Sequence, residues 1–288
     1  MCPAEETSPR VDSALVGELL AEQHPDLASE PLAKAGEGWD NITYRLGRRR
    51  AVRLPKRREA AELVVSERRW LPGVARRLGV DVPLPERAGR PGAGYPWPWS
   101  IVRWVDGSTA DRTPPGPGTG ALLGTVLRRL HRPSPHDAPH NPFRGVPLVD
   151  RAEAVQRWLL DAALPRSTST AMRALWRDGV DAPPAAGTVW VHGDLHPRNV
   201  VTRGGALAGI IDWGDVSGGD PAVDLASAWT ILRSESERKD FWKRYGASEA
   251  ERCRARAWAV FFALALISAG DAGHRTLGSR IVEEVVGG

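Results

Sequence analysis

Cysteine is nearly absent from this chain of 288 residues, and long apolar runs are absent altogether. The two cysteines, Cys2 and Cys253, support neither a disulfide framework nor a zinc site. No stretch reaches the roughly eighteen consecutive apolar residues of a transmembrane helix, so we expect no membrane span. The opening residues, MCPAEETSPR, lack the basic start and the apolar segment of a secretory signal, which favours a cytoplasmic protein.

Lysine is also scarce, because only four of the 39 basic residues are lysines. The net charge is a modest +4, and the basic clusters at residues 48–50 and 56–58 are short. A nucleic-acid-binding surface needs a longer basic stripe with interleaved aromatic residues. We therefore interpret these clusters as solvated surface and expect neither nucleic acid nor a membrane among the partners.

The order of the predicted elements changes at about residue 105. Before it, short extended pieces separated by Gly and polar residues predict a small antiparallel sheet, with strands at 31–35, 42–46, 51–54, 82–84 and 99–105. A helix is expected at 59–78, and Pro72 should bend or split it. After the loop TPPGPGTG, helical patterns dominate, with one long helix expected at 221–232. The sequence predicts an α+β protein with a sheet-rich part, 1–104, and a helix-rich part, 105–288.

The segment VWVHGDLHPRNVV, residues 189–201, places a polar loop between two apolar runs. His192, Asp194 and His196 alternate, and on a strand they would share a metal ion. Gly193 and Pro197 favour a loop instead, and no third histidine is nearby to complete a hydrolase-type cluster. A zinc hydrolase site is therefore the weaker interpretation of this segment.

Two further polar residues give the segment a different role. Asn199 follows Asp194 by five positions, and Asp212 follows it by eighteen, directly after the apolar run 208–211. Asn and Asp oxygens suit a hard cation such as Mg²⁺. An Asp outside the metal site can accept the proton of a hydroxyl nucleophile. This set predicts phosphoryl transfer, which needs a cation on the phosphates and a positioned base.

The same spacing occurs in protein kinases, in which Asp-x-x-x-x-Asn precedes the metal-binding Asp of Asp-Phe-Gly. Here HGDLHPRN, IIDWGD and GDPAVDLA closely resemble the aminoglycoside phosphotransferase family, a bacterial branch of the kinase-like fold. The resemblance covers about residues 31–269. It implies a bilobal kinase-like fold with a small antiparallel-sheet lobe that clamps the nucleotide and a mostly helical lobe that holds the catalytic loop and the acceptor. It also implies Mg²⁺ together with ATP or GTP.

The resemblance gives roles to individual residues of this chain. Asp194 would be the catalytic base, and Asn199 and Asp212 would bind the magnesium ion. His192 would be a structural histidine that holds the loop, and Asp224 would brace the loop without touching the substrate.

Candidates for nucleotide binding lie in the sheet-rich part. Gly36, Gly38 and Asn41 follow the kinase pattern Gly-x-Gly-x-x-Gly, with Asn in the third place. The position of the kinase strand-three lysine holds Arg53, which keeps the positive charge and binds phosphate oxygens with a different geometry. Lys56 is the competing cation.

Two further features are expected of a nucleotide site: an acidic partner for Arg53 and backbone groups that bind the adenine. Glu67, in the following helix, is expected to pair with Arg53, with Glu59 and Glu62 as competitors. The resemblance implies that backbone groups of Arg103–Val105 bind the adenine edge. No Gly-x-x-x-x-Gly-Lys occurs, which disfavours the P-loop class of nucleotide-binding proteins.

The acceptor is poorly specified by the sequence. Members of the resembling family phosphorylate aminoglycosides, macrolides, cyclic peptide antibiotics, or metabolites such as choline and homoserine. A polycationic acceptor favours an acidic cleft, yet residues 105–288 hold 21 acidic and 22 basic residues. Candidate acceptor contacts are Asp215, the strongest, and Asp271, with Asp161, Glu235 and Glu237 behind them.

We expect an antibiotic O-phosphotransferase whose partners are a nucleoside triphosphate and a small-molecule acceptor, acting as a monomer or a dimer. A metabolite kinase is the first alternative. A nucleotide-binding pseudokinase is the second, because Arg53 stands where kinases have lysine.

Overall fold

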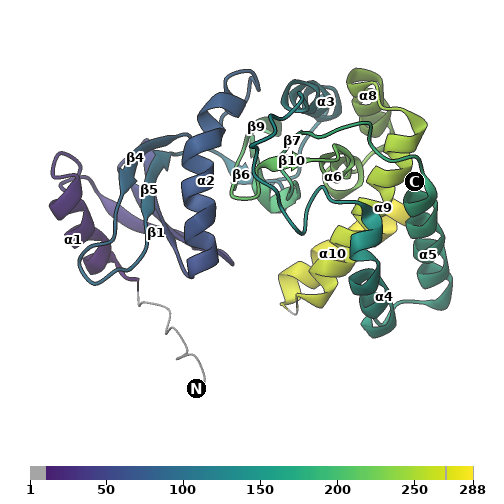
Figure 1. Cartoon of the computed structure of the whole chain (residues 1–288), viewed down its shortest axis with the longest axis horizontal. Helices are drawn as coiled ribbons and strands as arrows, with labels where there is room; N and C mark the ends of the chain where they lie inside the picture. Colours follow the sequence, from purple (N-terminus) through teal and green to yellow (C-terminus); the bar gives the residue numbers. More distant parts are fainter. Residues whose placement is uncertain (1–10, 270, 288) are drawn as a thin grey trace. The chain divides into compact units, whose positions relative to one another are not determined.

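The computed structural model of the protein describes residues 11–269 and 271–287. The chain divides into two compact units: the first takes the chain up to Arg76 together with Val82–Val105, and the second takes Arg77–Asp81 together with the chain from Asp106 on (Figure 1). The first unit carries a sheet and two helices, and the second is mostly helical. The α+β class predicted from the sequence is confirmed.

The first unit is built on a five-stranded antiparallel sheet in the order β1-β2-β3-β5-β4. Its strands are β1 (Leu32–Glu37), β2 (Asn41–Leu46), β3 (Arg50–Pro55), β4 (Pro85–Gly89) and β5 (Trp99–Arg103). The strand expected at 82–84 is wrong in position, because that segment is a tight turn in which Leu84 N donates to Val82 O at 2.8 Å. Pro83 has no N–H to give to a sheet.

Two helices complete this unit. Helix α1 (Ser13–Gln23) is capped by Asp12, whose Oδ1 accepts from Leu15 N at 3.0 Å. Helix α2 (Arg58–Ala75) lies along the sheet (Figure 1) and contacts β3, β4 and β5. Pro72 neither splits nor ends α2, contrary to expectation. Pro72 lies in the last turn of α2. The hydrogen bond that a proline removes is lost near the end of the helix, so the helix before it stays intact.

Small sheets in the second unit frame the polar loop. Strand β7 (Val189–Val191) pairs with β10 (Ser217–Gly219), and β8 (Val200–Arg203) pairs with β6 (Ser108–Thr109) and β9 (Ala206–Ile210). The chain leaves β7, forms the loop 192–199 with a short 3-10 turn at Pro197–Asn199, and enters β8. Both ends of the loop are therefore fixed by strands.

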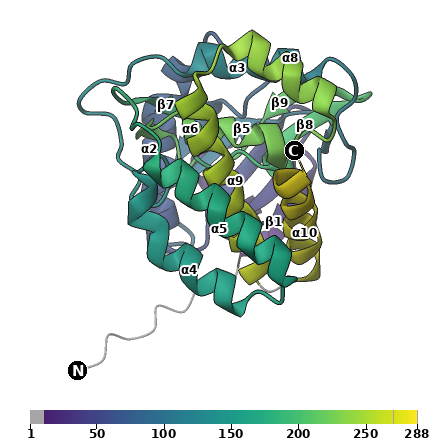
Figure 2. The ribbon, with the colours of Figure 1, turned by 90° about the vertical axis from the view of Figure 1, so that its right-hand side faces the viewer.

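Helix α9 (Glu249–Ser268) is the central helix of the second unit. It begins with a capping box formed by Ser248 and Glu251, and most of its residues are buried. Figure 2 shows α9 between α5 and α10, with α4 beside it. The other helices of this unit are α3 (Thr119–Leu130), α4 (Ala152–Asp161), α5 (Arg166–Asp181), α6 (Ala222–Leu225), α7 (Ser227–Thr230), α8 (Glu235–Tyr245) and α10 (Ala272–Gly287).

The single helix expected at 221–232 is divided into α6 and α7. Ala226, at the junction, has φ −54° and ψ −21°, close to the dihedrals of a 3-10 helix. The backbone therefore forms a tighter turn at Ala226 and then continues as helix α7.

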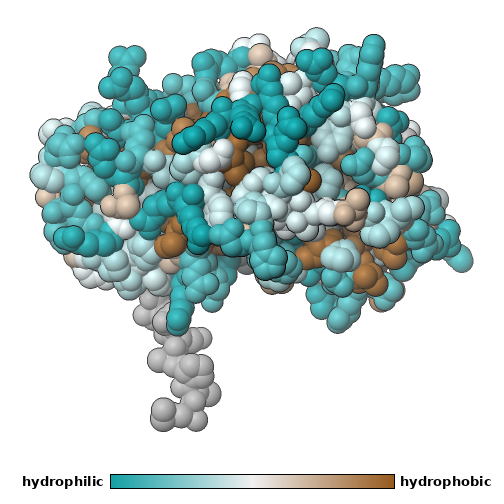
Figure 3. Space-filling view, turned by 45° about the horizontal axis from the view of Figure 1, so that its top comes forward, coloured by the Kyte–Doolittle hydropathy of each residue, from teal (hydrophilic) through white to brown (hydrophobic). Residues whose placement is uncertain are grey.

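The face shown in Figure 3 is mostly hydrophilic, with smaller apolar patches between the polar side chains. Large apolar side chains that remain exposed include Trp39, Phe143, Val149 and Leu160. Within the described ranges, no helix has both the length and the apolar composition that a membrane crossing requires.

Candidate active site

Asp224 holds the start of the polar loop. Its carboxylate is fully buried, and it accepts from His192 N at 2.7 Å and from Gly193 N at 2.8 Å. His131 Nε2 lies 3.2 Å from the same carboxylate. Gly193 has φ +86°, and a Cβ there would lie 3.2 Å from Asp215 O, so glycine suits the position. This is the bracing position that the sequence suggests for Asp224.

His192 joins the loop to the strand that follows. Its Nδ1 accepts from Asp194 N at 3.2 Å, and its Nε2 lies 3.0 Å from Ile211 O. The ring is fully buried against Trp213. Both ring nitrogens therefore contact backbone groups, and His192 offers no free nitrogen to a metal ion. Among the described residues, no group of three or more His, Cys, Asp or Glu side chains is arranged to hold a metal, which argues against the zinc hydrolase interpretation.

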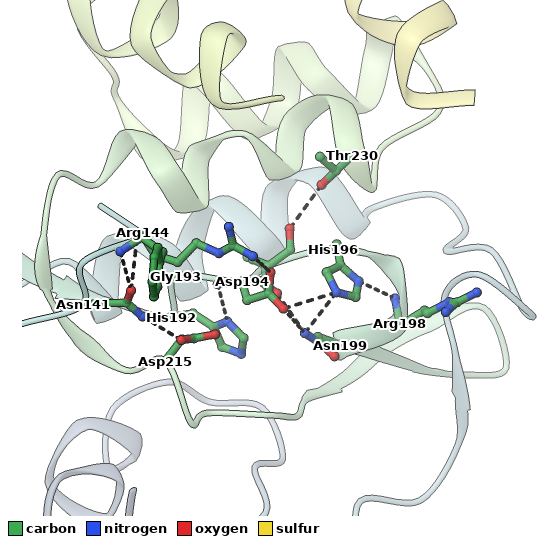
Figure 4. Close-up of polar contacts among 12 residues, drawn as sticks. Asn141, Arg144, His192, Gly193, Asp194, His196, Arg198, Asn199, Asp215 and Thr230 are labelled. Atoms are coloured by element: carbon green, nitrogen blue, oxygen red, sulfur yellow. Dashed lines mark hydrogen bonds and ion pairs between the residues drawn. The ribbon is translucent and has the colours of Figure 1, made fainter. Parts of the chain in front are cut away.

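The Asp194 carboxylate lies among cationic and amide groups (Figure 4). Arg144 Nη2 donates to Oδ1 at 3.2 Å, while His196 Nε2 and Asn199 Nδ2 each lie 3.3 Å from Oδ2. Burial by itself would raise the pKa of Asp194, but the charges of His196 and Arg144 outweigh it and hold the pKa well below its ordinary value. Asp194 is therefore a carboxylate that stays ionised and is able to orient a hydroxyl group.

Asn199 and Asp212 are placed by a hydrogen bond between their two segments. Ile211 N donates to Asn199 O at 2.9 Å, so the residue before Asp212 is fixed to the end of the loop. Asn199 Nδ2 donates to Asp194 O at 2.9 Å, which leaves its Oδ1 available as an acceptor. Asp212 follows β9, is exposed, and has φ +63°, an unusual value for a residue other than glycine.

The residues present fit a magnesium ion. Asn199 Oδ1 and the Asp212 carboxylate are hard oxygen donors, and Mg²⁺ is bound by one or two such protein groups together with phosphates and waters. A site with few protein ligands agrees with the absence, in the described part of the chain, of a larger cluster of acidic, His and Cys ligands.

A segment that the sequence did not single out approaches Asp194 from the other side. Asn141 Oδ1 accepts from Phe143 N and from Arg144 N, and its Nδ2 donates to Asp215 Oδ1 at 2.6 Å. This turn places Arg144 over Asp194 (Figure 4). Burial, followed by the charge of Asp194, raises the pKa of Asp215. No spacing in the sequence links residues 141–144 to the loop, because the contact spans 50 positions.

Asp271, the second candidate for an acceptor contact, is engaged in local structure. It stands just before α10, where its Oδ1 accepts from His274 N at 2.8 Å and its Oδ2 contacts the His274 ring. His274 Nε2 lies 2.6 Å from Arg198 Nη1, so α10 contacts the loop through Arg198. Asp271 is therefore linked to the polar loop through His274 and Arg198.

In the first unit, Arg53 on β3 donates to both carboxylate oxygens of Glu67 on α2, at 2.8 and 2.9 Å. Arg53 is 8% exposed and Glu67 is 3% exposed. The pairing expected from the sequence is present, and neither Glu59 nor Glu62 takes that place. Lys56, the competing cation, contacts Glu37 at 2.7 Å instead. Hydrogen bonds from Lys34 and Lys56 lower the pKa of Glu37 to about 2.

The glycine-containing turn joins β1 to β2. Gly38 N donates to Asn41 O at 2.9 Å, and Gly36 lies within β1 after a bulge. A Cβ at Gly36 would meet nothing within 4 Å, and one at Gly38 would meet only Asn41 O at 3.8 Å. The space beside both glycines is open, and the buried Asn41 Oδ1 has no hydrogen-bond partner among the described residues.

The end of β5 is already partly bonded to its neighbours. Arg103 N donates to Leu84 O at 2.9 Å, and Trp104 N donates to Arg49 O at 2.8 Å. These two N–H groups are bonded within the protein. Val105 N makes no backbone hydrogen bond within the described chain, so it is available to a ligand.

Solved structures of small-molecule phosphotransferases share this fold. The GDP complex of wild-type aminoglycoside 2'-phosphotransferase-IIIa matches with a TM-score of 0.71 at 18% identity, covering 96% of this chain and 99% of that chain. Macrolide 2'-phosphotransferase MphH from Brachybacterium faecium matches with a TM-score of 0.62 at 18% identity, covering 93% and 97%. At these identities the likeness shows the fold alone, and that fold is kinase-like, as predicted.

The Phosphotransferase enzyme family matches residues 32–258, and the chain belongs to this family. The protein is therefore a phosphotransferase enzyme, which confirms the resemblance seen in the sequence. A curated relative, the uncharacterized protein YcbJ of Bacillus subtilis (strain 168), is 24% identical over 196 residues, or 63% of this chain. The match spans 62% of the length of that relative.

Proposed function

We propose that the protein transfers the γ-phosphoryl group of ATP or GTP to a hydroxyl group of a small molecule. The observation that supports this most directly is the placement of Asp194 beside Asn199, with Asn199 tied to the Asp212 segment through the bond from Ile211 N to Asn199 O. A base and two hard oxygen ligands are the groups that phosphoryl transfer requires.

In this proposal, Asp194 accepts a hydrogen bond from the acceptor hydroxyl and takes its proton as the oxygen–phosphorus bond forms. The bond between the γ-phosphorus and the β–γ bridging oxygen breaks, and the nucleoside diphosphate leaves with that electron pair. Asn199 and Asp212 would hold Mg²⁺, which when bound neutralises charge on the phosphates. The lowered pKa of Asp194 makes it a weak base, so its main contribution is to orient the nucleophile.

The first unit would bind the nucleotide. Arg53, oriented by Glu67, would contact phosphate oxygens, and the open space beside Gly36 and Gly38 allows close approach of a phosphate to the backbone. Arg103 O and Val105 N would pair with a purine edge. Related structures bear GDP or ADP, which supports a nucleotide co-substrate without choosing between ATP and GTP.

The acceptor is first sought among antibiotics, because the structural relatives are named as aminoglycoside and macrolide phosphotransferases. A metabolite is the second candidate, and one observation favours it: Arg144, a cation, occupies the approach to Asp194. A polycationic antibiotic would be repelled at that position.

Asp194→Asn tests the proposal. Asparagine has no negative charge to orient the acceptor hydroxyl and cannot take its proton, so we expect phosphoryl transfer to fall by at least about a hundredfold while Mg-nucleotide still binds. Transfer would be followed by mass spectrometry of products from a panel of antibiotics and hydroxylated metabolites, and nucleotide binding by calorimetry. Unchanged turnover in Asp194→Asn contradicts the assignment of the base.

The pseudokinase alternative predicts a different result. A binding protein would bind Mg-nucleotide with Arg53 and Glu67 in place, yet it would neither transfer phosphate to any acceptor nor hydrolyse the nucleotide. Nucleotide hydrolysis by the wild-type protein that is lost in Asp194→Asn excludes this alternative.

A further inference from the structure

Two arginines lie over a shared aromatic ring, Phe261, and one of them, Arg144, contacts Asp194. The Arg144 guanidinium lies 5.4 Å from the ring centre of Phe261 and 5.2 Å from that of Phe262. The Arg151 guanidinium lies 5.5 Å from the ring centre of Phe261 and 5.4 Å from that of Phe143. Aromatic faces attract cations at this range. We call Arg144 and Arg151, which both lie over the ring of Phe261, the arginine pair.

The arginine pair has few anionic partners. Arg144 makes one ion pair, with Asp194 at 3.2 Å, and its buried Nε has no hydrogen-bond partner among the described residues. Within the same residues, no carboxylate lies within 4.0 Å of the Arg151 guanidinium, and its buried Nε is also without a partner. Each guanidinium has five donors in a rigid fork, and within the described residues the pair donates one hydrogen bond, from Arg144 Nη2 to Asp194 Oδ1.

The acidic groups near the pair offset its charge only in part. Burial and the charge of Arg144 lower the pKa of Arg151 more than the charge of Asp150 raises it. Asp194 is the proposed base, and its Oδ1 must be free when the acceptor hydroxyl binds. Asp215 Oδ1 takes its hydrogen bond from Asn141 Nδ2, at 2.6 Å, rather than from an arginine. An incompletely paired cation in a partly buried place is costly to keep, and a bound anion removes that cost.

We propose that the acceptor carries an anionic group, a carboxylate or a phosphate ester, which the arginine pair binds so that the acceptor hydroxyl meets Asp194. This rests on the proposed function and narrows its substrate class. The acceptor anion takes the place of Asp194 Oδ1 on Arg144, and Asp194 is thereby released to accept the hydroxyl proton. Binding of an anionic acceptor then frees Asp194 from Arg144 in the same step.

The pair also selects against other acceptors. A polyamino sugar would bring ammonium groups towards two guanidinium groups with few counter-charges, and like charges at close range strongly disfavour binding. A neutral alcohol would leave the donors of Arg151 without a partner. Hydroxy acids and sugar phosphates fit both the charge and the forked geometry.

The test measures phosphoryl transfer to three groups of acceptors, with ATP and with GTP as the donor. The groups are hydroxy acids and sugar phosphates, their neutral esters or parent sugars, and polyamino sugars. Wild-type protein should give a kcat/KM for an anionic acceptor at least about tenfold above that of its neutral counterpart. Arg151→Gln should remove most of this ratio, chiefly by raising KM for the anionic compound. Arg151→Lys should restore part of it, because lysine keeps the charge and loses the fork.

Arg157→Gln is the matched control, because Arg157 is an exposed arginine on the neighbouring helix α4. It should leave the ratio unchanged. Preference of the wild-type protein for neutral or polyamino acceptors overturns the proposal, as does an Arg151→Gln variant that keeps the wild-type ratio. The preference of the wild-type protein is measured without any variant, so a variant that fails to fold does not prevent the decision.

A binding measurement covers the case in which no compound in the panel is phosphorylated. Glycerate and glycerol 3-phosphate, titrated into wild-type protein with Mg-ADP, should bind at millimolar concentration, and glycerol should not. Separate arms for the two anions show whether carboxylate or phosphate is preferred. Absence of binding by both overturns the anionic acceptor, whereas failure of Mg-nucleotide itself to bind overturns the proposed function.

Discussion

The Arg53 guanidinium donates to both oxygens of the Glu67 carboxylate, at 2.8 and 2.9 Å, and both side chains are buried. Arg53→Ala leaves Glu67 buried without its cation, so we expect a loss of about 3–5 kcal/mol in the free energy of unfolding. Affinity for Mg-ADP should fall by about tenfold or more. Chemical denaturation and calorimetry measure the two effects.

Arg203→Ala is the control for this change. Its ion pair with Asp81 lies at the surface, with the two side chains 59% and 53% exposed, so its loss should leave stability and nucleotide affinity within error. If Arg53→Ala behaves like Arg203→Ala, the buried pair is not part of the nucleotide site.

Asp224→Asn tests the brace of the polar loop that carries Asp194. Asparagine has one acceptor oxygen, and its NH₂ group would face the N–H of His192 or Gly193, which both donate to Asp224 in the native protein. We expect a loss of about 2–4 kcal/mol in the free energy of unfolding, because a buried donor is left unpaired. Amide hydrogen exchange at His192 and Gly193 should become faster than in the exposed control Asp81→Asn. Unchanged exchange rates at these two amides would show that the brace lies elsewhere.

Asp212→Asn and Asn199→Ala test the proposed magnesium ligands. Removing one of two protein ligands should raise the Mg²⁺ concentration for half-maximal phosphoryl transfer by at least about tenfold. Titration of the rate with Mg²⁺ gives this value, and EDTA should abolish transfer by the wild-type protein. Asp178→Asn, an exposed aspartate on α5, should keep the wild-type Mg²⁺ dependence. Equal dependence in all variants would place the ion at other residues.

Gly124→Ala tests the close contact between α3 and α8. A Cβ at Gly124 would lie 2.7 Å from Phe241 O and 3.3 Å from Tyr245 N, which are backbone atoms that must move. We expect a loss of about 1–3 kcal/mol in the free energy of unfolding. Gly17, inside α1, has nothing within 4 Å of its Cβ position, and Gly17→Ala should stabilise the protein by about 0.5–1 kcal/mol. Thermal or urea unfolding measures the change in the free energy of unfolding of each variant. Changes of the same sign in Gly124→Ala and Gly17→Ala would contradict this prediction.

The polar loop was readable from the sequence because its residues lie close together in the chain, whereas the bracing role of Asp224, 31 and 32 positions from the two N–H groups it accepts from, was implied by the family resemblance. Asp194 and Asn199 are five residues apart on one turn, and Asp212 directly follows a recognisable strand. The pairing of Arg53 with Glu67 was also expected, because the two residues are only fourteen positions apart, on a strand and on the helix that follows it. Pro72 was misjudged because its effect depends on where the helix ends, and that end is set by packing.

The sequence by itself determined the family, the α+β class and the residues of the phosphoryl-transfer motif, because each is carried by a short pattern of residue types. Only the tertiary structure placed Arg144 on Asp194 across 50 positions and joined Arg198 to His274 across 76. It likewise brought Arg151 to Phe261, on another helix of the same unit. Contacts of this kind follow from how helices and loops pack, and no local spacing records them. The motif residues are thus recognisable from their spacing, whereas the cation that contacts Asp194 is placed there by the packing of segments far apart in the sequence.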